Sequence, residues 1–399
     1  MTDPRIDLRA RIESLLAEGP AAALERERSA FDKSAAPFER SLVLFGAGNI
    51  GRKTAAGLRK LGIEPVLFAD NNPALWGKQV EGVTVVSPEE ASRRHARDAA
   101  FVVTIWRGEG QDHMKDRLGL LKRLGCQRVV TFGPLFWKYP DLFLPHYAAA
   151  PAHQVHQHAG AVLSAAGLWQ DEASRREYES QIRWRLFFDF DHLADPVTHP
   201  IYFPSDICPL TSDEIFVDCG AFDGDTLRSF LDRAPSGFRK IIAFEPDPGS
   251  FGKLSRFVST LPRKNSIELH QAATGSINGP LRFTGGGLPS ASVGSGSLEV
   301  KGVKLDDALA GAPVTYIKMD IEGAELDAIA GARRTIQEHG PVLAVCSYHR
   351  QDHLWNIPNL IHSYNPDYCF FLRPHLLEVW DLVCYAIPRR RLKPAAKRP

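Results

Sequence analysis

A chain of 399 residues is longer than one ordinary hydrophobic core supports, so its length predicts two domains. The apolar content of 44% and charged content of 24% are typical of a soluble globular protein, and the formal net charge of +1 favours neither a nucleic-acid nor a membrane partner. The six cysteines include no C-x-x-C pair, which argues against a zinc site and against a disulfide framework.

Residues 1–35 predict one or two amphipathic helices, because leucine and isoleucine recur at helical spacing among charged residues. Such helices could cap the first domain or support a homo-oligomer. The segment lacks the apolar core of a signal peptide, and no apolar run approaches the roughly 20 residues that cross a bilayer. We therefore expect a cytoplasmic protein with no membrane span.

The first glycine-rich turn lies between two strand-like runs, residues 42–45 and 66–69. Residues 46–51 form a complete G-x-G-x-x-G, a helix is predicted over residues 52–61, and an aspartate follows the second strand. This layout is typical of a nucleotide-binding βαβ unit, and the alternative is a turn that only packs the helix on the strand. The residues predicted to bind a nucleotide or nucleotide sugar are Gly46, Gly48, Asn49, Ile50, Gly51, Asp70 and Asn71.

The next segment, residues 70–88, reads DNNPALWGKQVEGVTVVSP. It resembles the N-terminal domain of sugar O-acyltransferases of the NeuD type and related sugar-modifying proteins, in which D-D/N-N-P precedes G-V-x-V. The resemblance covers about residues 40–135, where residues 101–106 and 129–132 predict further strands and residues 118–124 a helix. It implies a Rossmann-like domain that handles a nucleotide-linked sugar.

Residues 133–165 read as a connection rich in proline, and its four histidines are interpreted as surface residues rather than as a metal site. Residues 168–193 predict a helix that packs on the second domain. The expected organisation is an N-terminal domain at 1–145, a helical linker at 146–194, a second domain at 195–388 and a basic, disordered tail at 389–399.

The second glycine-rich turn, within residues 215–226, also lies between a strand and a helix, but it is acidic. The carboxylates of Asp218, Asp223 and Asp225 would repel a pyrophosphate, whereas a ligand with hydroxyls, an amine and a sulfonium cation would be favoured there. Glu245 follows the next predicted strand, where a carboxylate can bond both hydroxyls of a ribose. The turn therefore predicts a site for S-adenosylmethionine (SAM).

The rest of the second domain continues the alternation of strands and helices. A Gly/Ser-rich insertion at residues 275–297 is interpreted either as a flexible linker or as a lid over a substrate. Further strands are predicted at residues 267–273, 316–319, 342–347, 368–372 and 382–387.

Five motifs of this half occur together: FVDCGAFDGDT (216–226), AFEPD (243–247), KLDD (304–307), YIKMDIEGAE (316–325) and VLAVCSYHR (342–350). In this order they resemble the FkbM family of SAM-dependent methyltransferases, over about residues 200–390. The resemblance implies the class I methyltransferase fold, a doubly wound α/β sheet of seven strands with a reversed last strand. It also implies methylation of hydroxyls on sugars, natural products or related small molecules. The predicted SAM-binding residues are Asp218, Gly220, Phe222, Gly224, Asp225, Thr226, Glu245, Asp247, Ala272 and Asp320.

Methyl transfer to a hydroxyl requires an aligned acceptor and a base that removes its proton. His349 follows the fifth strand and is the predicted base, with a purely structural, hydrogen-bonded histidine as the alternative. Asp320 and Glu322 follow the fourth strand, at the same sheet edge, and could orient the acceptor, act as base or hold a divalent cation. Lys318 is interpreted as a half-exposed side chain or as the partner of an acid.

The sequence therefore predicts an SAM-dependent O-methyltransferase that acts on a sugar, nucleotide sugar or glycan precursor, with no nucleic-acid partner. One alternative is an NAD(P)-dependent sugar-modifying oxidoreductase, but the first domain has no Tyr-x-x-x-Lys. Another is a non-catalytic protein that binds a sugar nucleotide, against which the intact Asp218, Gly220, Glu245 and Asp320 argue.

Overall fold

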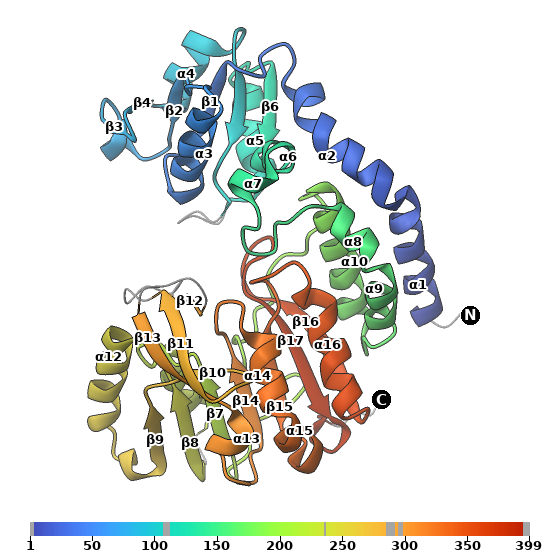
Figure 1. Cartoon of the computed structure of the whole chain (residues 1–399), viewed down its shortest axis with the longest axis vertical. Helices are drawn as coiled ribbons and strands as arrows, with labels where there is room; N and C mark the ends of the chain where they lie inside the picture. Colours follow the sequence, from blue (N-terminus) through green and yellow to red (C-terminus); the bar gives the residue numbers. More distant parts are fainter. Residues whose placement is uncertain (1–3, 107–111, 235–236, 285–291, 294–297, 394–399) are drawn as a thin grey trace, which may run out of the picture. The chain divides into compact units, whose positions relative to one another are not determined.

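The structure, a computed structural model, describes residues 4–106, 112–234, 237–284, 292–293 and 298–393. The chain forms two compact units (Figure 1). The N-terminal unit comprises residues 11–159 and 179–195, and the C-terminal unit comprises residues 1–10, 160–178 and 196–399. The segment 146–194, expected as a linker, is thus divided between the two units, and residues 394–399 of the expected tail lie outside the described residues.

The N-terminal unit contains a six-stranded sheet in the order β3-β4-β2-β1-β5-β6, parallel except for the β3–β4 pair. Strand β1 is buried along its whole length, as expected for the central strand of a parallel sheet with helices packed against it. The strands are β1 (Leu42–Phe45), β2 (Leu67–Ala69), β3 (Gln79–Val80), β4 (Val83–Val86), β5 (Ala100–Val103) and β6 (Arg128–Thr131).

Helices α3, α4 and α5 of this unit lie between successive strands, α2 precedes β1, and α6, α7 and α8 follow β6. The helices are α2 (Gly19–Ala35), α3 (Asn49–Lys60), α4 (Pro88–His95), α5 (Met114–Arg123), α6 (Phe132–Lys138), α7 (Pro140–Phe143) and α8 (His153–Gln157). Helices with residues in both units are α1 (Pro4–Leu15), α9 (Ala159–Ala166) and α10 (Glu172–Phe187). No helix among the described residues is long and apolar enough to cross a membrane.

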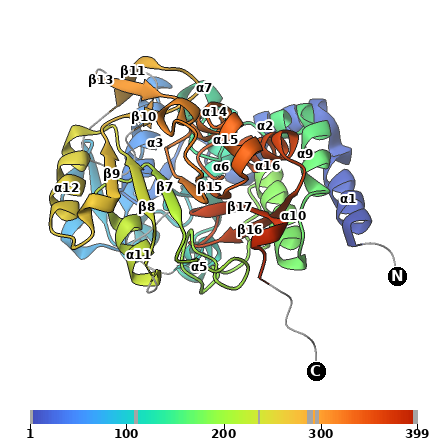
Figure 2. The ribbon, with the colours of Figure 1, turned by 90° about the horizontal axis from the view of Figure 1, so that it is seen from below.

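The C-terminal unit contains a seven-stranded sheet in the order β16-β17-β15-β14-β7-β8-β9. Strands β16, β17, β15, β7, β8 and β9 are labelled in Figure 2, and β14 is labelled in Figure 1. Strand β17 runs antiparallel to both of its neighbours, β16 and β15, and the five strands β15, β14, β7, β8 and β9 pair in parallel. The strands are β7 (Ile215–Cys219), β8 (Lys240–Phe244), β9 (Ile267–His270), β14 (Tyr316–Met319), β15 (Val342–Cys346), β16 (Tyr368–Pro374) and β17 (Leu382–Pro388). The helices are α11 (Asp225–Arg233), α12 (Pro248–Ser259), α13 (Leu305–Ala308), α14 (Glu325–Gly331), α15 (Arg333–His339) and α16 (His353–Tyr364). The predicted α/β class with two Rossmann-like sheets, one of seven strands, is confirmed.

The Gly/Ser-rich insertion contributes to a separate four-stranded sheet, in the order β10-β13-β11-β12. Its strands are β10 (Ala273–Thr274), β11 (Gly279–Thr284), β12 (Ser292–Val293) and β13 (Leu298–Val303). The prediction of one strand over residues 267–273 was therefore wrong, because β9 belongs to the large sheet and β10 to the small one. Residues 285–291 and 294–297 of the expected lid lie outside the described residues.

Candidate active site

The glycine turn after β7 is shaped by close packing of the backbone. Gly220 has a φ of +81°, and a Cβ at this position would lie 2.0 Å from the carbonyl oxygen of Asp320. Gly224 has a φ of +95°, and a Cβ there would lie 2.7 Å from the ring of Phe257 on α12. Both positions therefore require glycine, since a side chain would push the turn away from its neighbours.

A buried ion pair lies directly behind this turn. The Nζ atom of Lys318 is 3.0 Å from Oδ1 of Asp218, and the two side chains are 2% and 0% exposed. The same Nζ donates a hydrogen bond of 2.7 Å to the carbonyl oxygen of Gly220. Burial alone would lower the pKa of Lys318, but Asp218 and the neighbouring carboxylates outweigh it and raise that pKa. Lys318 is thus the partner of an acid, and Asp218 acts on the turn through Lys318.

Glu245 joins the turn after β7 to the loop after β8. Its two oxygens accept backbone N–H groups of Phe222 and Asp247, each at 2.8 Å, and only 6% of the residue is exposed. Burial raises the pKa of Glu245 to about 7, although both hydrogen bonds oppose that shift. Asp247 in turn caps α12 by accepting the N–H of Ser250 at 2.9 Å.

The remaining predicted SAM residues lie at the same edge. The side chain of Asp225 accepts the N–H of Thr226 at 2.7 Å in the first turn of α11. Ala272 is buried just beyond β9. The structure therefore brings the predicted residues together at the carboxyl ends of β7, β8, β9 and β14, the edge where ligands of open α/β sheets bind.

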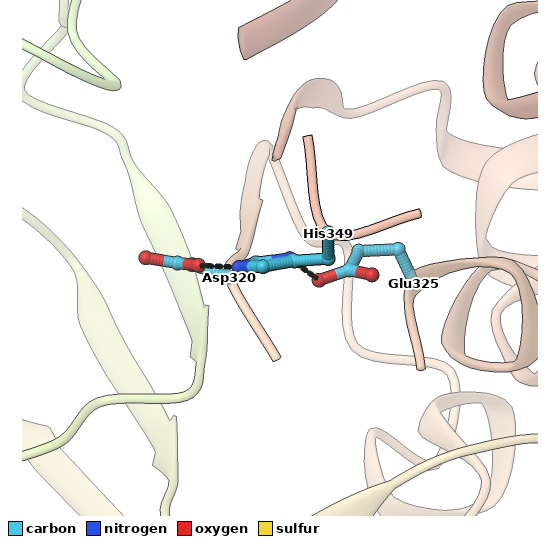
Figure 3. A group of neighbouring side chains, drawn as sticks. All are labelled: Asp320, Glu325 and His349. Carbon is cyan, nitrogen blue, oxygen red and sulfur yellow. Dashed lines mark hydrogen bonds and ion pairs between the residues drawn. The ribbon is translucent and has the colours of Figure 1, made fainter. Parts of the chain in front are cut away.

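Four side chains after β14 and β15 form the acceptor cluster, defined as Asp320, Glu322, Glu325 and His349. Figure 3 shows the imidazole of His349 between the carboxylates of Asp320 and Glu325. Nε2 of His349 lies 3.3 Å from Asp320 Oδ1 and 3.7 Å from Glu322 Oε1, and Nδ1 lies 2.8 Å from Glu325 Oε1. The three predicted catalytic residues therefore meet, together with a fourth that was not predicted.

The charges of this cluster are strongly coupled. Burial would lower the pKa of His349, but Glu325 and the other two carboxylates outweigh it and raise that pKa to about 9. Burial would raise the pKa of Glu325, but His349 outweighs it, and the pKa of Glu325 falls to about 2. At neutral pH the cluster is therefore an imidazolium surrounded by carboxylates.

The spacing of Asp320, Glu325 and His349 resembles that of metal ligands, with one atom of each within 4.8 Å of the others. However, the two carboxylates face opposite nitrogens of the imidazole (Figure 3). One ion could not bind all three side chains in this orientation, because it would have to contact both nitrogens of the ring. A cation held by Asp320 and Glu322 stays a prediction.

Sequence reasoning missed two residues of this site. Tyr202 is buried and donates a hydrogen bond of 2.7 Å to Oδ2 of Asp320, and its own carbonyl oxygen accepts the hydroxyl of Tyr316. Glu325 could have been suspected from its place at the start of the helix after β14, where a carboxylate can accept loop N–H groups. Tyr202 carries no such signal, since it lies 118 residues before Asp320.

The first glycine turn is braced in a similar way. Gly46 has a φ of +114°, and a Cβ on Gly51 would lie 1.9 Å from the carbonyl oxygen of Gly46. Asp70 accepts the N–H of Ala47 at 2.7 Å with one carboxylate oxygen. A Cβ on Gly48 would have no atom within 4 Å. Close packing therefore explains the glycines at positions 46 and 51. Of the three glycines, only Gly48 has free space where a side chain would be.

Comparison with known proteins gives one match to a family model and several matches to solved structures. Residues 218–375 match the family model described as the methyltransferase FkbM domain. The crystal structure of methyltransferase FkbM from Methylobacillus flagellatus KT aligns over 95% of this chain and 98% of its own, with 23% sequence identity and a TM-score of 0.75. This similarity shows that the two proteins share a fold.

Other similarities are weaker. An rRNA methylase from Streptococcus thermophilus aligns over 45% of this chain and 89% of its own, with 16% identity and a TM-score of 0.30. A precorrin-6y C5,15-methyltransferase from Geobacter metallireducens GS-15 aligns over 44% and 80%, with 13% identity and a TM-score of 0.29. No curated protein matches the chain. Over residues 218–375, the chain is similar to the methyltransferase FkbM domain.

Proposed function

We propose that this enzyme transfers the methyl group of SAM to a hydroxyl of a sugar, nucleotide sugar or glycan precursor. The observation that carries the proposal is the meeting, at one sheet edge, of the braced turn after β7 with the acceptor cluster. SAM would supply a methyl group on a sulfonium centre. The chain itself must bind that donor, align the acceptor and remove a proton.

The residues at the turn fit SAM. Each carboxylate oxygen of Glu245 accepts one backbone N–H, and a carboxylate oxygen has a second lone pair for a ribose hydroxyl. The open side of the turn carries Asp223 and Asp225, which favour a cationic ligand over a pyrophosphate. Ala272 and Asp247 complete the proposed binding edge beside β8 and β9.

The acceptor cluster supplies the proton chemistry. Asp320 and Glu322 would accept hydrogen bonds from the acceptor, while Nε2 of His349 takes the proton of the reacting hydroxyl. Because the pKa of His349 is raised to about 9, the neutral base becomes populated only as the pH approaches that value. Methyl transfer should therefore increase with pH from neutrality to about 9.

The choice of a sugar acceptor is supported by the N-terminal unit. Its strand–turn–helix with Asp70 resembles that of sugar-modifying proteins, and Gly48 leaves its backbone accessible. In this proposal the N-terminal unit binds a nucleotide or nucleotide sugar, and the C-terminal unit methylates it or a glycan derived from it.

Two measurements test the proposal. Calorimetry with SAM and with S-adenosylhomocysteine should show binding that Glu245→Gln weakens, and absence of binding by the unaltered protein would refute the proposal. Transfer of radiolabelled methyl groups should then be screened across nucleotide sugars and polysaccharide fragments. His349→Ala should reduce transfer by about 10²–10⁴-fold without loss of SAM affinity. Transfer that His349→Ala leaves unchanged would remove His349 as the base.

A further inference from the structure

Glu325 is the one acid of the acceptor cluster to which the reaction just described gives no task. It is the last residue of the sequence YIKMDIEGAE and the first residue of α14. Its side chain is 0% exposed, so it cannot touch an acceptor. Burying a carboxylate costs free energy unless it is paired and hydrogen-bonded. The burial of Glu325 therefore has to be explained by its partners.

We propose that Glu325 is the positioning residue of the acceptor site: it fixes His349 with Nε2 toward the acceptor and holds the loop that presents Asp320 and Glu322. The proposal rests on the proposed function in one respect, that His349 takes the proton of the acceptor hydroxyl.

The contacts of Glu325 divide between the loop and two histidines. Oε1 accepts the N–H of Ile321 at 2.9 Å and lies 2.8 Å from Nδ1 of His349. Oε2 accepts the N–H of Gly323 at 3.1 Å and lies 3.2 Å from Nδ1 of His353. One side chain thus ties the loop after β14 to the ends of β15 and α16.

The bond to Glu325 determines which imidazole nitrogen carries the proton. An ionised carboxylate only accepts hydrogen bonds, so Nδ1 of His349 must donate, and the neutral ring has its lone pair on Nε2. Nε2 points to the side where Asp320 and Glu322 lie, at 3.3 and 3.7 Å. The base is therefore aimed at the place where those two carboxylates would hold the acceptor.

The loop contacts explain the backbone between Asp320 and Glu325. Glu322 has a φ of +54°, an unfavourable value for a residue with a side chain, and Gly323 has a φ of +106°. The two N–H groups that this conformation turns inward are those bonded by Glu325. Without that carboxylate, both N–H groups would lose their partner, and the position of Glu322 would no longer be fixed.

Among the charged neighbours of His349, Glu325 has the largest effect on the pKa of the imidazole. Its charge contributes most to raising the pKa of the imidazole, ahead of Asp320 and Glu322. His353 has its own pKa lowered by burial, so it shares Glu325 as a neutral ring. The titratable and charged groups around His349 are Glu325 on α14, Asp320 and Glu322 in the loop after β14, Tyr348 and Arg350 beside it, and His353 on α16.

Glu325→Gln tests the positioning effect, because it keeps the shape and removes the charge. A glutamine amide can donate a hydrogen bond to Nδ1, which would leave the proton on Nε2. Nε2 would then have no lone pair to accept the proton of the hydroxyl. We expect kcat to fall by about 10²–10⁴-fold, the rising limb of the pH profile to move below pH 9, and SAM affinity to stay within about twofold. Glu338→Gln, an exposed position on α15, is the matched control and should match the unaltered enzyme.

A spectroscopic experiment needs neither an acceptor nor a folded Glu325 variant. With ¹⁵N-labelled histidine in the unaltered protein without added ligand, titration from pH 7 to 10 shows which nitrogen of His349 loses its proton. His349→Gln assigns the signals. Loss from Nε2 supports the proposal, and loss from Nδ1 overturns it.

Two further outcomes would overturn the proposal. One is an unchanged pH profile in a folded Glu325→Gln variant. The other is activity that a chelator abolishes and Mg²⁺ or Mn²⁺ restores, since Nε2 would then face a metal ion instead of a hydroxyl. Failure of SAM binding would refute the proposed function while leaving the nitrogen titration as it is, so the two proposals fail separately.

Discussion

Replacing Lys318 with methionine would leave Asp218 buried without its partner, behind the turn proposed to bind SAM. Both side chains are almost fully buried, and Lys318 also holds the carbonyl oxygen of Gly220. Removing one member of a buried ion pair typically costs about 3–5 kcal/mol. In a domain of this size, roughly 2–4 °C of melting temperature corresponds to each kcal/mol, so we expect a loss of about 6–20 °C.

The pH dependence makes this prediction sharper. Asp218 can relieve the unpaired charge by taking up a proton, and its ordinary pKa is 3.8. At about 1.4 kcal/mol per pH unit, protonation costs about 4 kcal/mol at pH 7 and about 2 kcal/mol at pH 5. The destabilisation by Lys318→Met should therefore be halved at the lower pH, and adding Asp218→Asn should recover much of it, because a neutral pair replaces the lone charge.

Differential scanning calorimetry measures the change in melting temperature, and hydrogen exchange of β7 and β14 amides reports on the site of the change. Arg228→Met is a suitable control, since its ion pair with Asp223 is solvent-exposed and worth at most about 1 kcal/mol. If Lys318→Met were no more destabilising than Arg228→Met, or if its effect did not change between pH 5 and pH 7, Asp218 could not be an ionised, buried partner of Lys318.

Three more predictions concern the same sheet edge. Gly220→Ala would place a Cβ 2.0 Å from a backbone carbonyl oxygen, so it should abolish calorimetric SAM binding and cost roughly 1–3 kcal/mol or more, whereas Gly275→Ala, with no atom within 4 Å, should do neither. The raised pKa of His349 stabilises the fold fully below about pH 6.5, and up to about 3 kcal/mol should be lost as the pH rises through about 9; melting curves of His349→Gln should lack this loss. Because the pKa of Glu245 is about 7, SAM affinity should increase as the pH rises through 7 and the carboxylate forms, and it should stay flat in Glu245→Gln.

Much of this architecture could be predicted from the sequence, because its signals are local. Apolar runs of four to six residues that end in glycine or acidic residues give parallel strands, and parallel strands align their carboxyl ends at one edge. The residues after β7, β8, β14 and β15 were therefore expected to meet before any contact was known. His349 and Asp320 illustrate this, since their separation by 29 positions in sequence becomes 3.3 Å between side chains.

The functions of individual acids could not be predicted in this way. A carboxylate at the edge of a sheet can face a ligand, a lysine or the backbone, and the choice depends on burial and on side-chain rotamers. Asp218 faces Lys318, and Glu325 faces the loop and two histidines. In the small sheet, β11 and β13 pair across an insertion whose glycine and serine content indicated only a linker or a lid.

The two glycine turns of this chain illustrate how far sequence composition can be taken as a guide to ligands. In each, an acid after the next strand accepts an N–H of the turn, Asp70 for one and Glu245 for the other. In each, a side chain in or directly after the neighbouring strand donates to the carbonyl oxygen of a turn glycine. Thr104, just after β5, donates to Gly46 at 2.8 Å, and Lys318, in β14, donates to Gly220 at 2.7 Å.

The two donors, the hydroxyl of Thr104 and the ammonium of Lys318, differ in charge. This difference explains why one of the acidic residues of the second turn, Asp218, is present. A threonine hydroxyl can be buried without a counter-ion, whereas a buried ammonium requires one. Asp218 meets that requirement, so its presence follows from the choice of lysine as donor and says little about the ligand. The preference for a cationic ligand then rests on Asp223 and Asp225, which lie on the accessible side of the turn. Replacing Asp223 and Asp225 with asparagine should weaken SAM binding only by removing negative charge. Asp218→Asn should weaken it by removing the partner of Lys318, which holds the turn in place.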